Sequence, residues 1–293
     1  MSQVSIIIPT FNRLYILQKV LASYLDQSSL LELIIVDDAS TDGTTQYIQA
    51  LNHPKINLIT HAKNQGQPSA KNTGIHAATG DYIAFGEDDL FFDPRYIEIL
   101  LKTMQAKDAD IAAGRLVYLH ENEPFESAQK RASNHHPYFN HWTLAGNYQK
   151  MDTDAFEVPF LHACALIKRP VASTLLYDTG YKVPALREET DFYLRAYASD
   201  YKLLFVPKTI VYHLPIDAIK TGGSWANGWL QYHYQAILNQ FRFTKIHHKT
   251  LKQIGLKSPP FLFNLLHVLN RFRILYRSLR YQMTHRIYRG TPH

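Results

Sequence analysis

An apolar run that leads directly into carboxylates occupies residues 33–44, LIIVDDASTDGT. The same arrangement returns in residues 82–89, YIAFGEDD. Because parallel strands end along one edge of a sheet, carboxylates that follow two such strands can converge on one crevice. Like charges at close range cannot all stay ionised unless a cation offsets them, and a divalent cation favours a phosphorylated ligand. The pattern therefore predicts a metal and a nucleotide diphosphate at this edge.

Strand and helix patterns alternate through the first half of the chain. Strands are predicted at residues 4–9, 33–36, 56–59 and 82–85, with helices after residue 13 and at 44–51 and 68–77. Short connections between alternating strands and helices favour parallel strands and right-handed crossovers. An open, doubly wound α/β sheet is therefore expected over about the first 115 residues.

The second half of the chain is less regular. Residues 120–156 are polar, aromatic and rich in histidine, and we expect a long loop over the site. A helix is predicted at 189–201, then strands at 203–206 and 209–212, then mostly helix. The expected domains are an α/β domain at 1–218, with halves at about 1–115 and 116–218, and a basic helical extension at 219–293.

Size and composition fit one large α/β domain with an appendage. The 293 residues can bury a sizeable core, and no segment has the roughly 18 uninterrupted apolar residues of a membrane span. The single cysteine, Cys164, excludes an internal disulfide framework, and its apolar neighbours favour a buried thiol over a nucleophile. These features predict a cytoplasmic protein that does not span a membrane.

Four segments, in order, resemble family 2 glycosyltransferases of the GT-A fold, which implies a Rossmann-like, doubly wound mixed sheet, here with a helical C-terminal extension. Residues 6–13, IIIPTFNR, are similar to the first strand and nucleotide-cradling loop of that family. In residues 37–43 the resemblance implies that Asp38 hydrogen-bonds the nucleotide base, whereas Asp37 and Asp42 stay open between a site role and a turn or capping role. The nucleotide-binding residues implied by these two segments are Pro9, Thr10, Phe11, Asn12, Arg13, Asp38 and Ser40.

The third segment, residues 64–74, resembles the stretch that passes beneath the diphosphate. It contributes Asn64, Gly66 and Lys71, and the family often has an arginine at the position of Lys71. Lysine keeps the charge but loses bidentate geometry. We interpret Lys71 as a phosphate contact, with an ordinary solvated helix lysine as the alternative.

Glu87-Asp88-Asp89 stands where the family has its Asp-X-Asp motif. The resemblance implies that Asp89 binds Mn²⁺ or Mg²⁺, which would neutralise charge on the leaving diphosphate. Direct ligation by the longer Glu87 is left open, and Asp88 is assigned to the ribose or the donor sugar. Similar enzymes often place another metal ligand at the position of His213, although a structural histidine is the alternative.

Residues 187–192, REETDF, resemble the acidic motif at the start of a helix that faces the acceptor. Aligning this motif makes Glu189 the general base for a direct displacement with inversion. Glu188 and Asp191 remain alternatives, either as the base or as residues that favour a helix N-terminus.

The last fifty residues carry ten lysines and arginines and no carboxylate. Between 261 and 289, apolar residues alternate with arginines, which favours a helix lying in an anionic membrane interface. Packing of this helix on the domain or on a partner subunit is equally open. Trp225 and Trp229 are interpreted either as an acceptor lid or as core. No nucleic-acid partner is expected, because no binding motif accompanies the charge.

The resemblance implies an inverting, metal-dependent glycosyltransferase that uses a nucleoside-diphosphate sugar, with UDP favoured. A glycan or lipid-linked acceptor, in polysaccharide biosynthesis for the cell envelope, is expected, with the protein cytoplasmic or peripheral on the inner face of the membrane. A Rossmann dehydrogenase is disfavoured, because no Gly-X-Gly-X-X-Gly follows the first strand. A metal-dependent nucleotidyl or phosphoryl transferase and a non-catalytic carbohydrate-binding module stay open.

Overall fold

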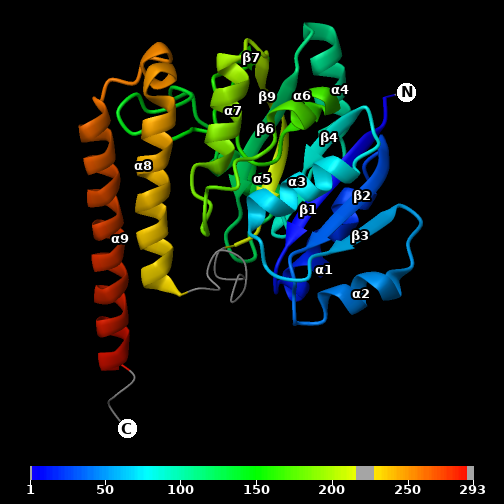
Figure 1. Ribbon diagram of the computed structural model, residues 1–293, viewed down its shortest axis with the longest axis horizontal. Helices are drawn as coiled ribbons and strands as arrows, with labels where there is room; N and C mark the ends of the chain where they lie inside the picture. Colours follow the sequence, from blue (N-terminus) through cyan, green and yellow to red (C-terminus); the bar gives the residue numbers. More distant parts are fainter. Residues whose placement is uncertain (1, 216–227, 289–293) are drawn as a thin grey trace.

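The computed structural model describes residues 2–215 and 228–288 (Figure 1). A mixed sheet runs through the body, helices cover both of its faces, and two long helices stand at one side (Figure 1). The strands are β1 Val4–Thr10, β2 Leu30–Asp37, β3 Ile56–Thr60, β4 Tyr82–Phe85, β5 Leu90–Phe92, β6 Ile111–Tyr118, β7 Phe156–Glu157, β8 Leu166–Lys168 and β9 Leu203–His213. The helices are α1 Leu14–Leu25, α2 Thr44–Leu51, α3 Gln67–Ala77, α4 Tyr96–Lys107, α5 Phe125–Arg131, α6 Arg169–Leu175, α7 Glu188–Ala198, α8 Trp229–Gln253 and α9 Pro260–Tyr288.

The sheet order is β3-β2-β1-β4-β8-β6-β9-β5, and β7 pairs with β9. The four strands predicted in the first half are present, and β3, β2, β1 and β4 are parallel neighbours. Beyond β4 the sheet is mixed, as the resemblance to the GT-A fold implies, because the short strand β8 is inserted antiparallel between β4 and β6. A strand of three residues is too short to leave a periodic pattern in the sequence.

Two sequence predictions need correction. The separate strands expected at 203–206 and 209–212 form one strand, β9, whose pairing with β6 shifts register between Ala113 and Arg115. Such an irregularity tolerates Pro207, which lacks a backbone donor. The region 120–156 is not loop throughout, since it contains α5 and two isolated bridges.

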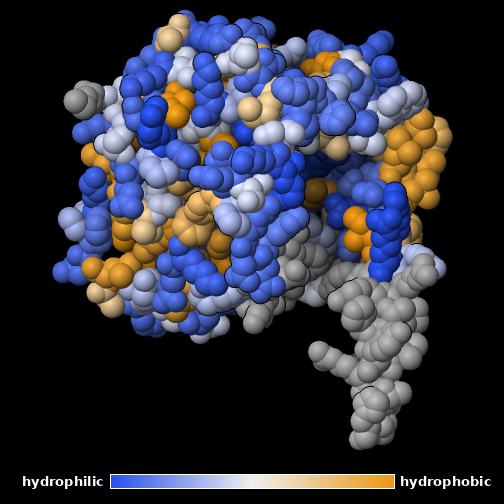
Figure 2. Space-filling view, turned by 180° about the vertical axis from the view of Figure 1, so that it is seen from behind, coloured by the Kyte–Doolittle hydropathy of each residue, from blue (hydrophilic) through white to orange (hydrophobic). Residues whose placement is uncertain are grey.

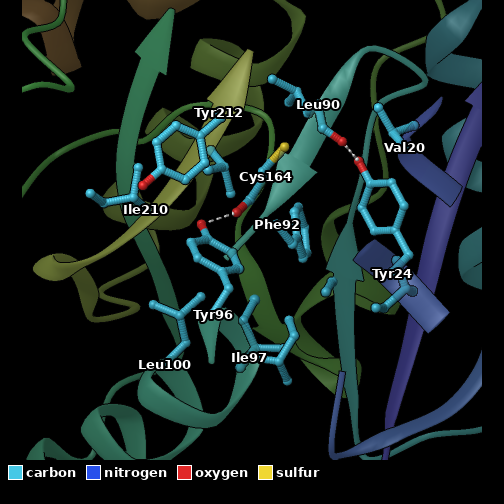
Figure 3. Packing of buried hydrophobic residues seen from close by; sticks show 14 of the residues in the cluster. Val20, Tyr24, Leu90, Phe92, Tyr96, Ile97, Leu100, Cys164, Ile210 and Tyr212 are labelled. Atoms are coloured by element: carbon cyan, nitrogen blue, oxygen red, sulfur yellow. Dashed lines mark hydrogen bonds between the residues drawn. The ribbon is translucent and has the colours of Figure 1, made fainter. Parts of the chain in front are cut away.

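Alternation along β1 divides the core into two halves. Ile6 and Ile8 face one hydrophobic cluster with α1 and α4, and Ile7 faces another with α3 and α7. In the first cluster, Tyr24 donates its hydroxyl to the carbonyl of Leu90 at 2.9 Å (Figure 3). Cys164 is also buried there, as predicted, beside the hydroxyl of Tyr96 (Figure 3). The strand edge that carries the acidic motif therefore rests on a packed layer.

Helices α8 and α9 form an antiparallel pair beside the body (Figure 1). Phe243 and Leu251 of α8 and Phe263 of α9 are buried in the second core cluster, so the pair is anchored to the body through the C-terminal half of α8 and the start of α9. The tail is helical as predicted, and no described helix is long and apolar enough to cross a membrane. The predicted boundary at residues 218 and 219, and Trp225, lie outside the described residues.

Candidate active site

A cavity of about 230 Å³ opens at the C-terminal edge of β1, β2 and β4. This is the edge where the sequence places its carboxylates, and a sheet crevice of this kind is a usual position for a ligand. The lining residues are Pro9, Thr10, Phe11, Arg13, Asp38, Asn64, Gly66, Gln67, Ala70, Glu87, Asp88, Asp89, Val183, Pro184, Ala185 and His213. Eleven of these were predicted as site residues from the sequence, so the separate segments do converge.

The acidic motif is held by a cation and a hydroxyl from the end of β1. Nη1 of Arg13 lies 2.9 Å from both Oδ1 of Asp88 and Oδ2 of Asp89. The hydroxyl of Thr10 donates to the other oxygen of Asp88 at 2.9 Å. Asp88 and Asp89 are both buried, so this arginine provides charge that the two carboxylates need.

The motif is also held from beneath. The Tyr24 hydroxyl lies 2.7 Å from the carbonyl oxygen of Glu87 and accepts the Glu87 backbone N–H at 3.2 Å. Gly86 leaves room for this ring, because a Cβ at that position would lie 2.6 Å from a Tyr24 ring carbon. A packed aromatic side chain thus sets the position of the first acidic residue.

The carboxylates of the motif repel one another. Burial, together with the charges of Asp89 and Glu189, raises the pKa of Glu87 to about 8. Burial raises the pKa of Asp88 to about 6, although the guanidinium of Arg13 opposes the shift. A further positive charge would relieve this repulsion, as the sequence pattern predicted.

Asp38 lines the cavity and also organises the loop after β3. Its carboxylate accepts the backbone N–H groups of Gln65 and Gly66 at 2.9 and 2.8 Å, and Nδ1 of His61 lies 2.7 Å from Oδ1. Asn64 donates to the Asp38 carbonyl at 3.3 Å. This loop-holding role was not predicted, and the contact of Asp38 with a nucleotide base stays a prediction.

Asn12 and Ser40 join the loops after β1 and β2, away from the cavity lining. The Ser40 hydroxyl accepts the Asn12 N–H at 2.8 Å, and the Asn12 side chain accepts the Thr41 N–H at 2.7 Å. Asp37 accepts the Ser40 N–H, and Asp42 accepts the N–H groups of Leu14 and Thr44. These four side chains therefore shape the turns that carry the lining residues.

Lys71 lies in a different place from either sequence interpretation. It is fully buried, with Nζ 2.7 Å from Oε1 of Glu188, 3.0 Å from Oε1 of Glu189 and 4.7 Å from the ring centre of Tyr177. Burial alone would lower its pKa, but the two glutamates raise it, so the ammonium is retained. A buried ion pair replaces both the expected phosphate contact and the solvated lysine, because α3 packs against the start of α7 at this point.

The three acidic residues of α7 differ in exposure and partners. Glu188 and Asp191 are buried, whereas the Glu189 side chain is 29% exposed. Oδ1 of Asp191 lies 2.7 Å from Nε2 of His247 and 3.1 Å from the Tyr181 hydroxyl. Burial acts to raise the pKa of Asp191, but the hydrogen bond to His247 and the charge of Arg195 lower it. Asp191 thus joins α7 to α8, and Glu189 is the carboxylate of the three that a ligand can reach.

A sequence model of "Glycosyl transferase family 2" matches residues 5–176. This chain belongs to glycosyl transferase family 2. An uncharacterized glycosyltransferase, YwdF of Bacillus subtilis (strain 168), is 30% identical over 223 residues, which are 74% of this chain and 75% of that protein. An uncharacterized glycosyltransferase of Rickettsia felis is 40% identical over 106 residues, which are 36% of this chain and only 17% of that protein.

Solved structures confirm the GT-A fold of this family 2 glycosyltransferase. S. aureus TarS 1-349 in complex with UDP-GlcNAc has a TM-score of 0.61 and 14% identity, covering 92% of this chain and 72% of that chain. The mannosyltransferase PcManGT from Pyrobaculum calidifontis, in complex with GDP-Man and Mn²⁺, has a TM-score of 0.61 and 17% identity. The match covers 95% of this chain and 75% of that chain. The sheet and the helices around it thus share the fold of these solved structures.

Asp89 and His213, two side chains that can bind a metal, lie close together where the family 2 resemblance places the metal. Leu90 pairs with His213 between β5 and β9, and this register brings Nε2 of His213 to 3.9 Å from Oδ2 of Asp89. In residues 2–215 and 228–288, no group of three histidine, cysteine or acidic side chains is arranged to hold a metal. The Asp89 carboxylate suits Mn²⁺ or Mg²⁺, since such ions are often held by one or two carboxylates, with substrate phosphates and water completing the ligands.

Sequence reasoning missed part of the cavity wall of this glycosyltransferase. Gln67 donates to the Glu87 carboxylate at 3.2 Å, and its position beside Gly66 in the third segment could have indicated it. The loop with Val183, Pro184 and Ala185 closes another side. It has no local signal, because its place beside the cavity follows from how α6 and α7 pack.

Proposed function

We propose that this glycosyltransferase inverts configuration while moving a sugar from a nucleoside-diphosphate sugar, with UDP favoured, to a glycan or lipid-linked acceptor. The observation that supports this proposal most strongly is that Arg13, Asp88 and Asp89 meet in one cavity. The partly exposed carboxylate of Glu189 lies outside the cavity lining but close enough for its charge to act on Glu87. TarS, PcManGT and GalNAc-T7 have been solved with UDP-GlcNAc, with GDP-Man and Mn²⁺, and with UDP, GalNAc and Mn²⁺ respectively, which supports this ligand class.

The cavity lining would bind the donor. The loops after β1 and β3 offer backbone groups, Asp38 borders the space for the base, and Asp88 that for the ribose or sugar. Asp89 and His213, with Glu87 beside them, would hold a divalent cation, which would supply positive charge for the leaving diphosphate. The raised pKa values of Glu87 and Asp88 fit a site whose carboxylates need that charge.

Glu189 would act as the base. Its carboxylate takes the proton of the acceptor hydroxyl as that oxygen forms a bond to the anomeric carbon, and the bond from this carbon to the diphosphate oxygen breaks. The nucleoside diphosphate leaves with the bonding electrons. Lys71, with Nζ 3.0 Å from Oε1 of Glu189, orients the carboxylate.

A panel of nucleotide sugars tests this function, with product release followed with and without Mn²⁺ or Mg²⁺. We expect a nucleoside diphosphate to be released only when acceptor and metal are present. Release of pyrophosphate would instead indicate the nucleotidyl transferase. Glycan binding without any metal-dependent turnover would indicate a carbohydrate-binding module.

The helix pair supports a role at a membrane surface, for a surface-glycan or cell-envelope enzyme on the cytoplasmic side. Exposed apolar side chains follow helical spacing on α8 at Leu230, Tyr234, Leu238 and Phe241, and on α9 at Phe261, Leu265, Leu269, Phe272 and Tyr276. Figure 2 shows hydrophobic patches on the side of the molecule that carries the helix pair. Residues 228–288 contain no carboxylate, so the pair complements anionic lipid rather than a basic partner.

Vesicle co-sedimentation of Phe272→Glu tests the membrane role. Phe272 is 59% exposed, so the change preserves the fold, whereas cutting α9 off would remove the buried Phe263. We expect binding to anionic vesicles at low salt to fall about tenfold or more, since an apolar anchor is lost and a repelling charge is gained. Leu51→Glu, on α2 away from the helix pair, is the matched control. Equal pelleting of Phe272→Glu and wild type would remove the membrane role.

A further inference from the structure

The start of α7 meets an aromatic and basic face of α9. Arg187, the residue before Glu188, lies with its guanidinium carbon 5.2 Å from the ring centre of Phe243 and 5.5 Å from that of Phe263. Phe263, His267 and Arg271 are spaced four residues apart and share one face of α9. Arg271 donates to Nε2 of His267 at 3.3 Å, and the charges of Arg271 and Arg187 both act on His267, so the two arginines lie near the same imidazole.

These cations have no carboxylate to offset them. Arg187 donates to the side chain of Gln240 at 2.9 Å and to the carbonyl of Thr143 at 3.4 Å, which are neutral acceptors. Among the described residues, neither Arg187 nor Arg271 forms an ion pair, and residues 228–288 contain no aspartate or glutamate. Buried or half-buried arginines usually pair with an anion, because removing their charge from water is unfavourable.

The electrostatics show the same lack of negative charge. Burial, followed by the positive charges of Arg271 and Arg187, lowers the pKa of His267 to about 3. Burial and then repulsion from Arg271 lower the pKa of Arg187 to about 10, although Tyr148 opposes the shift. Each cation therefore raises the energy of the others, and a bound anion would lower it.

The two arginines lie next to the proposed reaction site. Arg187 is two residues from Ala185, which lines the donor cavity, and two residues from Glu189. Burial raises the pKa of the Tyr148 hydroxyl, and the charge of Glu189 raises it further, whereas the charge of Arg187 lowers it. Both charged side chains therefore lie near Tyr148. An anion held by Arg187 and Arg271 would thus be close to Glu189, the proposed base.

We propose that Arg187 and Arg271 form an anion subsite that binds a phosphate group of the acceptor, with His267 positioning Arg271 by accepting its hydrogen bond. Phosphate suits a pair of guanidinium groups because each offers several donors in a planar fork. The group belongs either to a glycan phosphodiester or to a polyprenyl phosphate, and the exposed apolar residues of α8 and α9 offer a surface for the second. This inference rests on the proposed function for its acceptor, although the binding itself is independent of turnover.

Calorimetric titration of the full chain with methyl phosphate tests the subsite. Saturating UDP and Mg²⁺ are present, so that the donor cavity is filled and the remaining phosphate binding reports the new site. We expect Arg271→Gln to weaken this binding about tenfold or more, because a charge-assisted contact is lost. Arg273→Gln, an exposed arginine on the same helix with the same change in charge, should bind as the wild type does.

The outcomes separate the subsite from the donor site. UDP affinity should be unchanged in Arg271→Gln, and a normal UDP titration with no methyl phosphate binding would overturn the subsite alone. Equal methyl phosphate affinity of Arg271→Gln and wild type would also overturn it. Titrations with geranyl phosphate and with glycerol phosphate identify the source of the phosphate, with geraniol and glycerol as the controls that lack it. Tighter binding of geranyl phosphate indicates a lipid-borne acceptor. Equal binding of the two phosphates indicates a glycan phosphate. If UDP does not bind, the proposed donor fails, and the methyl phosphate titration without UDP still reports on Arg271.

Discussion

Glu189→Gln is expected to lower sugar transfer by a factor of about 10² or more, as loss of a general base typically does. The amide keeps the shape of the side chain but cannot take the proton of the acceptor hydroxyl. Lys71 keeps its second partner, Glu188, at 2.7 Å, so the buried ammonium remains paired and the fold should persist. Initial rates with acceptor measure the loss of transfer, and calorimetric titration with UDP measures donor binding separately.

The neighbouring acids provide controls for Glu189→Gln. Asp191→Asn should lower stability, because Asp191 is buried between His247 and Arg195, and breaking a buried pair costs about 3–5 kcal/mol. Glu188→Gln should disturb the position of Lys71, with a loss of rate smaller than that of Glu189→Gln. An active Glu189→Gln beside a folded but inactive Glu188→Gln or Asp191→Asn would show that the base is one of the other two.

Asp89→Asn is expected to lower metal-dependent turnover by a factor of about 10² or more at subsaturating Mn²⁺, because the substitution removes the charged oxygen ligand. The Arg13 guanidinium also contacts Asp88 at 2.9 Å, so the loop keeps an ion pair when Asp89 is neutral. Rates measured as a function of Mn²⁺ or Mg²⁺ concentration, with thermal unfolding as a check on the fold, give the result.

Glu87→Gln is the matched change in the same motif and should be milder. Glu87 is not paired with Arg13, and its raised pKa shows that its charge is already unfavourable in this setting. If Asp89→Asn retains near wild-type rates at subsaturating metal, the assignment of the metal to Asp89 is wrong. A greater loss in Glu87→Gln than in Asp89→Asn would move the site to Glu87.

Much of the fold followed from local sequence patterns. The apolar runs before Asp37 and Glu87, with a helix after each early strand, predicted parallel strands whose carboxylates share an edge, and β1 to β4 confirm this arrangement. The four segments could be placed together because strand direction, rather than distant contacts, brings them to one edge. Short strands such as β8 could not be predicted, because three residues are too few to show the alternation of apolar and polar side chains that marks a strand.

The partners of the charged side chains were decided by tertiary structure alone. Lys71 resembled a phosphate ligand in the sequence, yet it pairs with Glu188, which is 117 residues away in the chain. Arg13 meets Asp88 across 75 residues, and Arg187 contacts Phe263 of α9 only because the pair of α8 and α9 packs on α7 through α8. A residue's type and its neighbours in sequence determine its charge and local conformation, whereas the group that offsets a buried charge is whichever one the packing of helices on the sheet brings within a few ångströms.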